Sequence, residues 1–261
     1  MKNKHIFFVG IVLVLSMTSC LKSLLCVRGD GIIEVETHRV TSFNQIENST
    51  SFDIIYRKAD TLGISMRAEQ NILDYIETNV YDNCLEIRTS PGSICLDYTE
   101  KPVITVTSPS LNKIINSGSG AFLADMLSVE NISLKLSGSG DISVQNTTGN
   151  NIDIILSGSG NIRIEEATCS ISDFLISGSG DVYISGECEN GHLKTTGSGN
   201  IYSYDFITTS ISIIISGSGD IYTTVEDYLN GLISGSGNIY VRGDPKIDQT
   251  VTGSGRIIKT K

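Results

Sequence analysis

The chain is 261 residues long and acidic, with 19 Lys and Arg residues, 29 Asp and Glu residues and a formal net charge of −10 at pH 7. No cluster of basic residues offsets this charge, so binding of nucleic acid through its phosphates is excluded. The 26 glycines and the absence of tryptophan are not typical of a helical protein, and the length suits one elongated domain or two small ones.

The first 19 residues have the pattern of an export signal. They read MKNKHIFFVGIVLVLSMTS, and their apolar run is too short for a membrane-spanning helix. Cys20 follows directly, as in the lipobox of bacterial lipoproteins, so we expect removal of residues 1–19 and lipidation of Cys20, which would anchor the protein to a membrane. An ordinary signal peptide is the alternative. Residues 20–29 would form a tether, and the loss of two lysines would lower the formal charge to −12. We expect an exported protein of the outer membrane, facing the periplasm or the cell surface.

A short motif, Gly-Ser-Gly, recurs through the rest of the chain at steps of 18 to 20 residues. Its central serines are Ser119, Ser139, Ser159, Ser179, Ser198, Ser218, Ser236 and Ser254. Units of this length without a helical pattern predict the coils of a parallel β-solenoid over residues 111–258, in which each coil buries its apolar side against its neighbours.

Hydrophobic alternation continues across the motif. In NISLKLSGSGDISV, residues 131–144, apolar residues or glycines alternate with polar ones, which is the pattern of a β-strand with one buried face. The expected inward set is Ile132, Leu134, Leu136, Gly138, Gly140, Ile142 and Val144. Glycine at inward positions indicates a bend with no room for a Cβ atom, or backbone angles that other residues avoid.

The residue after each motif indicates how the units are arranged. Through the six central units it alternates between acid and amide: Asp141, Asn161, Asp181, Asn200, Asp220 and Asn238. In coils about 4.8 Å apart a column of aspartates would repel itself, whereas an intervening asparagine separates the charges and can donate to a carboxylate. The alternation favours stacked parallel coils over the alternative, in which each motif is a hairpin turn between antiparallel strands.

Two cysteines occupy equivalent positions in neighbouring units. Cys169 and Cys188 each precede the central serine of their motif by ten residues. Stacking would bring their Cα atoms within the range of a disulfide, which an exported protein can keep, so a Cys169–Cys188 disulfide is predicted. Two buried free thiols are the alternative.

Residues 30–110 lack the motif but are also predicted to be β structure. The strand-like segments are GIIEVET, FDIIYR, LGISMRA, CLEIRT and PVITVTS. AEQNILDYIE could form one short helix, with Ile72, Tyr75 and Ile76 on one side. This region would cap the solenoid or begin it with irregular coils, because an open end leaves strand edges unpaired.

The remaining three cysteines lie outside the repeat. Cys84 and Cys95 flank a Ser-Pro-Gly turn and could be bridged, which would leave Cys26 as the odd thiol.

Together these features resemble a known bacterial family. The lipobox, GIIEVETHRVTSFNQIE, AEQNILDYIETNV, KPVITVTSPSLNKI and the serial GSG-[DN]-I units are similar to the DUF2807 family, the auto-transporter adhesin head domain, over residues 30–258. The resemblance implies an all-β, right-handed parallel β-helix like that of pectin lyases, without their catalytic residues. It also implies a role in cell adhesion.

Few residues could carry out catalysis. Of the three histidines, His5 lies in the export signal, and His38 and His192 belong to no HExxH or similar motif. The carboxylates of alternate units could form a glycoside-cleaving pair two coils apart, but the repeat gives them near-identical surroundings, whereas a catalytic pair must differ. We therefore predict a non-enzymatic protein without a cofactor or a metal.

What the repeat offers is a surface. One outward column is an aromatic ladder, preceded by Arg163 in the equivalent place one coil earlier, and columns of Ser and of Asp and Asn run beside it. The predicted ligand face consists of Tyr183, Tyr202, Tyr222, Tyr240, Asp181, Asn200, Asp220 and Asn238. It could bind a glycan or a cell-surface protein, or its columns could only stabilise the stack. The sequence thus predicts an adhesin or interaction module, with a polysaccharide-binding or polysaccharide-cleaving β-helix as the alternative.

Overall fold

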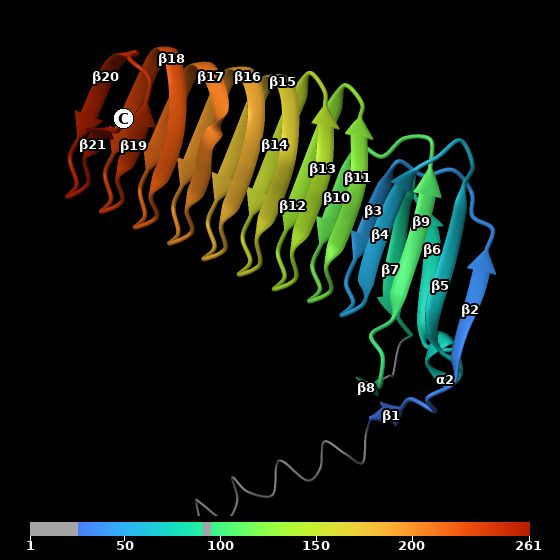
Figure 1. The fold of residues 1–261 in the computed structure, drawn as a ribbon. Helices are drawn as coiled ribbons and strands as arrows, with labels where there is room; N and C mark the ends of the chain where they lie inside the picture. The colour runs from blue at the N-terminus through green and yellow to red at the C-terminus, as the bar shows by residue number, and fades with distance from the viewer. Residues whose placement is uncertain (1–25, 91–94) are drawn as a thin grey trace, which may run out of the picture.

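The computed structural model describes residues 26–90 and 95–261, so the export signal and the predicted lipidation site Cys20 lie outside the described residues. The described chain is nearly all β structure, wound into a solenoid of about seven turns (Figure 1). The fold predicted from the Gly-Ser-Gly repeat is therefore confirmed.

Each coil contributes a strand to two faces, which we call A and B. The B face holds the strands that lead into each Gly-Ser-Gly turn, and the A face holds the strands that leave it. The first of these strands are β10 (Lys113–Asn116), β12 (Asn131–Leu136) and β14 (Asn151–Leu156) on the B face, and β11 (Phe122–Ser128) and β13 (Ile142–Thr148) on the A face. Four longer strands then run through both faces: β15 (Ile162–Ile176), β16 (Val182–Thr195), β17 (Ile201–Ile215) and β18 (Ile221–Ile233). The stack ends with β19 (Ile239–Arg242), β20 (Lys246–Val251) and β21 (Ile257–Lys259).

Neighbouring coils are parallel and in register. Ile142, for example, pairs with Phe122 of the coil before it and with Ile162 of the coil after it. All pairings from β10 to β21 are parallel, which rules out the hairpin alternative.

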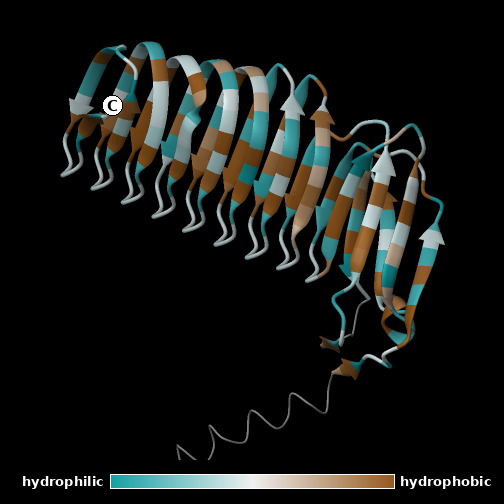
Figure 2. Ribbon diagram, viewed as in Figure 1, coloured by the Kyte–Doolittle hydropathy of each residue, from teal (hydrophilic) through white to brown (hydrophobic). Residues whose placement is uncertain are grey.

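The inward residues of both faces form one hydrophobic core. Apolar and polar residues alternate along the strands, as Figure 2 shows by colour. The apolar members of the expected inward set, Ile132, Leu134, Leu136, Ile142 and Val144, are at most 2% exposed. Burial of such β-branched and aliphatic side chains between the two faces supplies the main force that holds the coils together.

The Gly-Ser-Gly turns form one edge of the solenoid, the row of loops along the lower side of Figure 1. A Cβ atom on Gly160 would lie 2.0 Å from the carbonyl oxygen of Gly140 in the preceding turn. The turns approach so closely because they hydrogen-bond to one another, with the N–H groups of Ser159 and Gly160 both donating to the Gly138 carbonyl. No glycine of these motifs has a positive φ angle, so lack of space for a side chain, and not an unusual backbone conformation, requires glycine here.

The N-terminal region extends the stack and then closes it. Its parallel strands are β3 (Gln45–Asn48), β4 (Asp53–Lys58), β7 (Cys84–Thr89) and β9 (Val103–Ser108). Because β3 and β4 pair with β10 and β11, they form a coil that lacks the motif. Three antiparallel strands, β2 (Ile33–His38), β5 (Gly63–Glu69) and β6 (Ile76–Tyr81), cover this end, beside the short helix α2 (Gln70–Leu73). Reversed strands end the parallel stack and so cap it.

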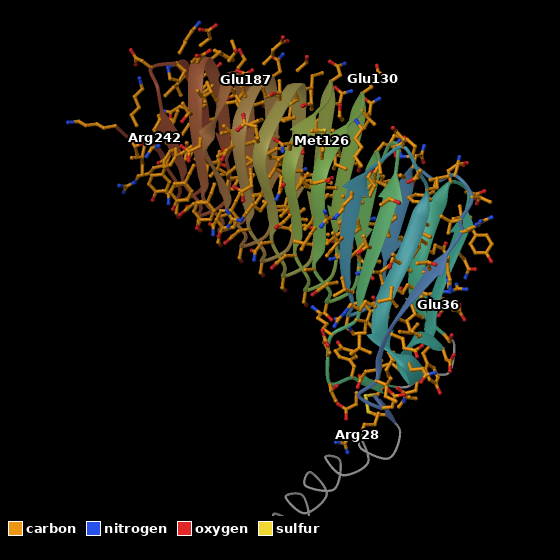
Figure 3. The ribbon with its side chains drawn as sticks, turned by 45° about the vertical axis from the view of Figure 1, so that its right-hand side comes forward. Arg28, Glu36, Met126, Glu130, Glu187 and Arg242 are labelled. Atoms are coloured by element: carbon orange, nitrogen blue, oxygen red, sulfur yellow. A yellow bond between two sulfur atoms is a disulfide. The ribbon has the colours of Figure 1, made fainter. Side chains whose placement is uncertain are left out.

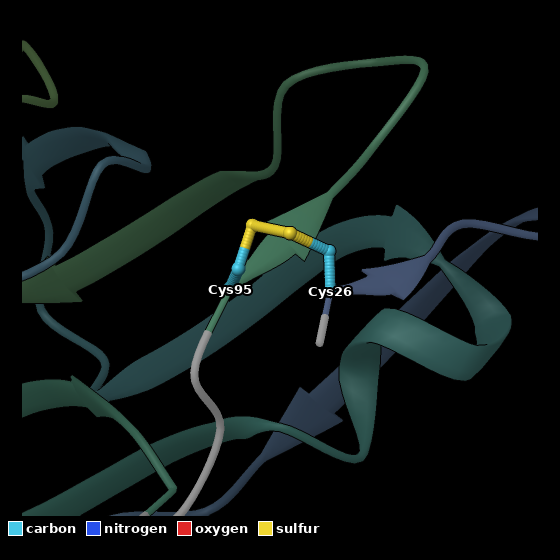
Figure 4. The surroundings of a disulfide bond; sticks show 2 residues. All are labelled: Cys26 and Cys95. Carbon is cyan, nitrogen blue, oxygen red and sulfur yellow. A yellow bond between two sulfur atoms is a disulfide. The ribbon is translucent and has the colours of Figure 1, made fainter. Parts of the chain in front are cut away.

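The disulfide differs from the one considered from the sequence. Cys26 bonds to Cys95, and Cys84 is a half-buried free thiol (Figure 4). The pairing of β1 (Val27–Arg28) with β8 (Leu96–Asp97) in a small separate sheet brings Cys26 beside Cys95. Proximity in sequence left a Cys84–Cys95 bond open, but Cys84 begins β7, where it pairs with Gln45 of β3 and Tyr81 of β6.

Candidate ligand face

The Asp and Asn residues after the turns form a continuous column on the A face. Each side chain accepts, through Oδ1, the backbone N–H of the equivalent residue one coil further on: Asp141 from Asn161, Asn161 from Asp181, Asp181 from Asn200, Asn200 from Asp220, and Asp220 from Asn238, at 2.6 to 3.0 Å. These side chains thus extend the backbone hydrogen bonding of the sheet into the turn.

The alternation of acid and amide has the electrostatic role expected of it. The Nδ2 groups of Asn161, Asn200 and Asn238 donate to the aspartate of the preceding coil at 3.3, 3.0 and 3.1 Å. Each carboxylate is therefore separated from the next by an amide that also donates to it. One oxygen of each aspartate thus already accepts two hydrogen bonds. The other oxygen of Asp181 accepts one from the Tyr183 hydroxyl at 3.3 Å, whereas those of Asp141 and Asp220 remain available to a ligand.

Asp53 is the first member of this column and was not predicted from the sequence. Asp53 accepts the backbone N–H of Ala121 at 2.8 Å, as the later residues do for their neighbours, and also forms an ion pair with Lys101 at 2.5 Å. The signal for it was present but weak, since Asp53 follows Ser51-Phe52 where the later coils have Ser-Gly.

The four tyrosines stack ring on ring beside the Asp and Asn column. The centroids of Tyr183, Tyr202, Tyr222 and Tyr240 are 4.8 to 5.0 Å apart, with interplanar angles of 6 to 11°. The guanidinium group of Arg163 lies 4.3 Å from the Tyr183 centroid and covers the first ring.

This stacking decides what the ladder can offer a ligand. Ring faces that are covered by neighbouring rings are closed to a sugar, which leaves ring edges and hydroxyl groups exposed. Burial raises the pKa of Tyr202, and the nearby charges of Asp181 and Asp220 add to this effect, so its hydroxyl remains a neutral donor and acceptor at physiological pH.

Two further residues extend the aromatic surface and were not singled out from the sequence. Tyr204 packs edge-on against Tyr222, with centroids 5.5 Å apart, and the Arg242 guanidinium lies 3.9 Å from the Tyr204 centroid. Tyr204 lies two residues after Tyr202 on the same side of the strand, so the alternation of strand residues could have found it.

Cys169 and Cys188 face each other on consecutive coils at the opposite edge of the solenoid. They pair in register, are both buried, and have their Sγ atoms 2.7 Å apart as free thiols. The hydrogen bond that Cys169 donates to Cys188, together with burial, raises the pKa of Cys169, whereas accepting it lowers the pKa of Cys188. The thiols therefore have the proximity that a disulfide needs, and the bond stays a prediction.

The histidines occupy unrelated positions. His38 binds Glu36 at 2.7 Å and Thr78 at 3.3 Å in the cap, and His192 lies on the B face. Within residues 26–90 and 95–261 no group of three or more His, Cys, Asp or Glu side chains could hold a metal ion. No helix in the same residues is long and apolar enough to cross a membrane.

The fold and its polar and aromatic columns define a class of elongated repeat proteins that display regular surfaces. A family model described as "Putative auto-transporter adhesin, head GIN domain", DUF2807, matches residues 42–171 and 145–245. The chain therefore belongs to this family, as the sequence resemblance implied, and the adhesin description indicates a cell-surface or exported protein.

Solved structures show the same fold. A structure called a putative lipid binding protein, from Parabacteroides distasonis, is 26% identical with a TM-score of 0.85, over 90% of this chain and 99% of that one. Structures called putative adhesins, from Parabacteroides merdae and Parabacteroides distasonis, are 23% and 22% identical with TM-scores of 0.86 and 0.85, each over 90% of this chain and 99% of the other. The comparison with curated proteins found no match.

Proposed function

We propose that this protein is a non-enzymatic, lipid-anchored cell-envelope protein that acts as an adhesin or interaction module. The observation that carries the proposal is the A face, where carboxylate and amide groups alternate from coil to coil and four tyrosines stack beside them in fixed register. A rigid, regular surface suits an extended partner because its groups need little ordering on binding. The family description supports the adhesive role, and the lipobox supports anchoring through Cys20 to the outer membrane.

The geometry also argues against an enzyme. Asp141, Asp181 and Asp220 each use one carboxylate oxygen to accept two hydrogen bonds from the following coil. Their hydrogen bonds within the column are thus the same, and only Asp181 gains a further one, from the Tyr183 hydroxyl. Glycoside cleavage needs one protonated and one ionised carboxyl group.

Adhesion is tested with cells that lack the protein. We expect deletion to reduce attachment to host cells or extracellular matrix, and the wild-type gene, but not Cys20→Ala, to restore it. Protease treatment of intact cells should remove the protein if it faces the surface. Unchanged attachment of the deletion strain would contradict the adhesin role.

Polysaccharide binding is the second candidate, because the Tyr ladder presents a row of hydroxyl groups beside the Asp and Asn column. Because the rings stack on one another, the role of their hydroxyl groups can be tested separately from the role of the rings. The double variant Tyr202→Phe, Tyr222→Phe keeps the stacked rings and removes two hydroxyl groups. The double change of the same residues to Ala removes the rings as well as the hydroxyl groups.

On a glycan array, hydrogen-bonded recognition should be lost in both double variants, and recognition through ring edges only in the Ala pair. A signal unchanged in both variants, or absent from wild type, would remove the ladder as a glycan site. Release of reducing ends from a polysaccharide, abolished by Asp181→Asn, would instead establish cleavage.

A further inference from the structure

The outer surface of the B face carries an aliphatic column that faces solvent. In-register pairing aligns Ile115, Lys135, Ile155, Leu175, Lys194, Ile214, Leu232 and Thr250. Five of these eight residues are Ile or Leu, although most outward positions of the coils are Ser, Thr, Asp or Asn. Leu175 and Leu232 remain 38% and 39% exposed. A row of apolar side chains on an otherwise polar surface is typical of an interaction site.

A column of polar residues beside this row places two negative charges next to each other. Asp153 and Asp173 are in-register neighbours on consecutive coils, followed by His192 on the next. Like charges directly opposite each other in a sheet are destabilising. The same chain avoids this arrangement on its A face, where an asparagine separates every two aspartates.

No ion pair within residues 26–90 and 95–261 compensates Asp153 or Asp173. Asp153 accepts a hydrogen bond from the Ser133 hydroxyl at 3.1 Å. Burial raises the pKa of Asp153, and the Ser133 bond opposes it; the charge of Asp173 raises the pKa further, and the charge of Lys113 lowers it. Lys113, two coils before Asp153 in the same column, compensates only part of the repulsion between the two aspartates. A local arrangement that costs stability is typical of a functional site.

The two columns meet at a hollow of about 320 Å³. Its lining includes Asp153, Asp173 and His192 from the polar column and Leu175 and Ile214 from the aliphatic row. The lining also includes Lys194, which lies between Leu175 and Ile214 in the aliphatic row. One side of the hollow therefore carries two carboxylates, and the other carries aliphatic side chains and one ammonium group. The two carboxylates lie one coil apart, about 4.8 Å by strand spacing.

We propose that this hollow binds an arginine side chain of an extended protein segment, whose neighbouring apolar residues pack along the aliphatic row. A guanidinium group presents five donors in a plane and can bond to both carboxylates, whereas an ammonium group is a single point charge. The methylene stem of arginine would cover Leu175 and Ile214. The partner's charge would remove the repulsion between Asp153 and Asp173. This inference rests on the proposed function as an interaction module, and it names the class of partner.

The test uses the full mature protein in detergent solution and a fluorescein-labelled peptide of sequence Leu-Arg-Leu-Arg-Leu-Arg. Its comparison peptide has citrulline, the neutral isostere, in place of each arginine. We expect the arginine peptide to bind, and Asp173→Asn to weaken binding about tenfold or more. Asp248→Asn is the matched control, because it makes the same charge change in the same column, four coils further on. It should alter affinity less than about twofold, an effect of net charge alone.

A stability measurement separates loss of the site from loss of the fold. Asp173→Asn removes the like-charge contact, so its thermal midpoint should equal or exceed that of the wild type while peptide binding falls. Equal losses in Asp173→Asn and Asp248→Asn, equal binding of the citrulline peptide, or no binding at millimolar peptide would each overturn the inference.

The same variant separates this inference from the adhesin proposal. If Asp173→Asn loses the peptide but deletion cells attach normally, the hollow stands and the adhesin proposal fails. If deletion abolishes attachment and Asp173→Asn binds the peptide as wild type does, the adhesin proposal stands and the inference about the hollow fails.

Discussion

Single polar side chains stabilise this protein by extending backbone hydrogen bonding where the strands turn. The Asp and Asn column does this on the A face, with amide and carboxylate in alternation. Asn200 lies between Asp181 and Asp220 and bonds to both coils through its side chain. The alternation of acid and amide therefore acts between neighbouring coils, although its members lie far apart in the sequence.

Asn200→Asp should destabilise the fold by about 1–2 kcal/mol at neutral pH, because it removes a donor and places three carboxylates in a row. The loss should shrink in high salt. Urea unfolding at two salt concentrations measures it. Gln249→Glu on the exposed strand β20 makes the same charge change and should cost little. Equal losses in the two variants would show that only net charge matters.

Glu69 provides a second residue-scale prediction. Its side chain accepts hydrogen bonds from the Thr99 N–H and hydroxyl groups and from the Gly31 N–H, which holds two loops of the cap together. Burial alone would raise the pKa of Glu69, but these bonds outweigh it and hold the pKa below its ordinary value of 4.5.

A carboxyl group whose pKa is lowered by folding stabilises the protein above its unfolded pKa, and this contribution is lost as pH falls through the folded value. Unfolding free energy should therefore drop below about pH 4.5 in wild type. Glu69→Gln, which cannot ionise, should be less stable at pH 7 and lose part of that acid-side slope. Urea unfolding from pH 7 to pH 3 checks both, and parallel pH profiles of the two proteins would contradict the assignment.

At the scale of the element, the turn imposes the glycines. Consecutive Gly-Ser-Gly turns approach so closely that their backbones hydrogen-bond, and the space left holds no Cβ atom. The outward serine between the glycines meets no such limit, since the central serines are exposed. The motif thus combines a solvent-facing serine with a second glycine that is buried in every turn.

Gly160→Ala should destabilise the protein by about 2–3 kcal/mol, because the new methyl group would overlap the Gly140 carbonyl and force the turns apart. Ser159→Ala in the same turn is the control and should change stability by less than about 0.5 kcal/mol. Thermal unfolding of both variants measures the difference. A Gly160→Ala protein as stable as the control would show that the turns can separate easily.

The paired thiols belong to the same scale, since only the stacking of two coils brings them together. We expect Cys169 and Cys188 to be linked in protein isolated from an oxidising compartment, because their Sγ atoms already lie 2.7 Å apart. Non-reducing peptide mapping should recover the two cysteines in one linked peptide. Recovery of both as alkylated free thiols would refute the bond.

The whole molecule is a one-dimensional stack whose two ends differ. The N-terminal end is closed by antiparallel strands and clamped by the Cys26–Cys95 disulfide, whereas at the other end β20 and β21 continue the parallel stack. Exposed Lys246 and Lys259 on these last strands reduce the tendency of open edges to pair with other chains. Figure 3 shows Glu130 and Glu187 along the edge opposite the turns, which adds to the negative charge of the surface.

In such a stack each coil is stabilised mainly by its neighbours, so opening the clamp should have a local effect. Cys26→Ser with Cys95→Ser should speed hydrogen exchange around β1 and β8 and leave the coils from β12 onward unchanged. Exchange followed by mass spectrometry measures this, with the wild-type protein as reference. Faster exchange throughout the solenoid would show that the clamp supports the whole stack.

The repeat, its alternation and the acid–amide pattern were enough to predict the parallel solenoid, its inward residues and the stacked Asp, Asn and Tyr columns. These features depend on a fixed period, because residues one period apart must become neighbours when coils stack. The N-terminal capping strands and the Cys26–Cys95 pairing lack a period. Proximity in sequence alone could not show the partner of Cys95.

The sequence by itself thus determined the stack and which side chains share a column. Only the tertiary structure decided that the ring faces of the tyrosines are closed and that two aspartates meet beside an apolar row on the B face. The physical reason is that the motif period specifies register along the stack. The surroundings of a side chain depend on neighbours from other columns, whose positions follow from the shape of the coil.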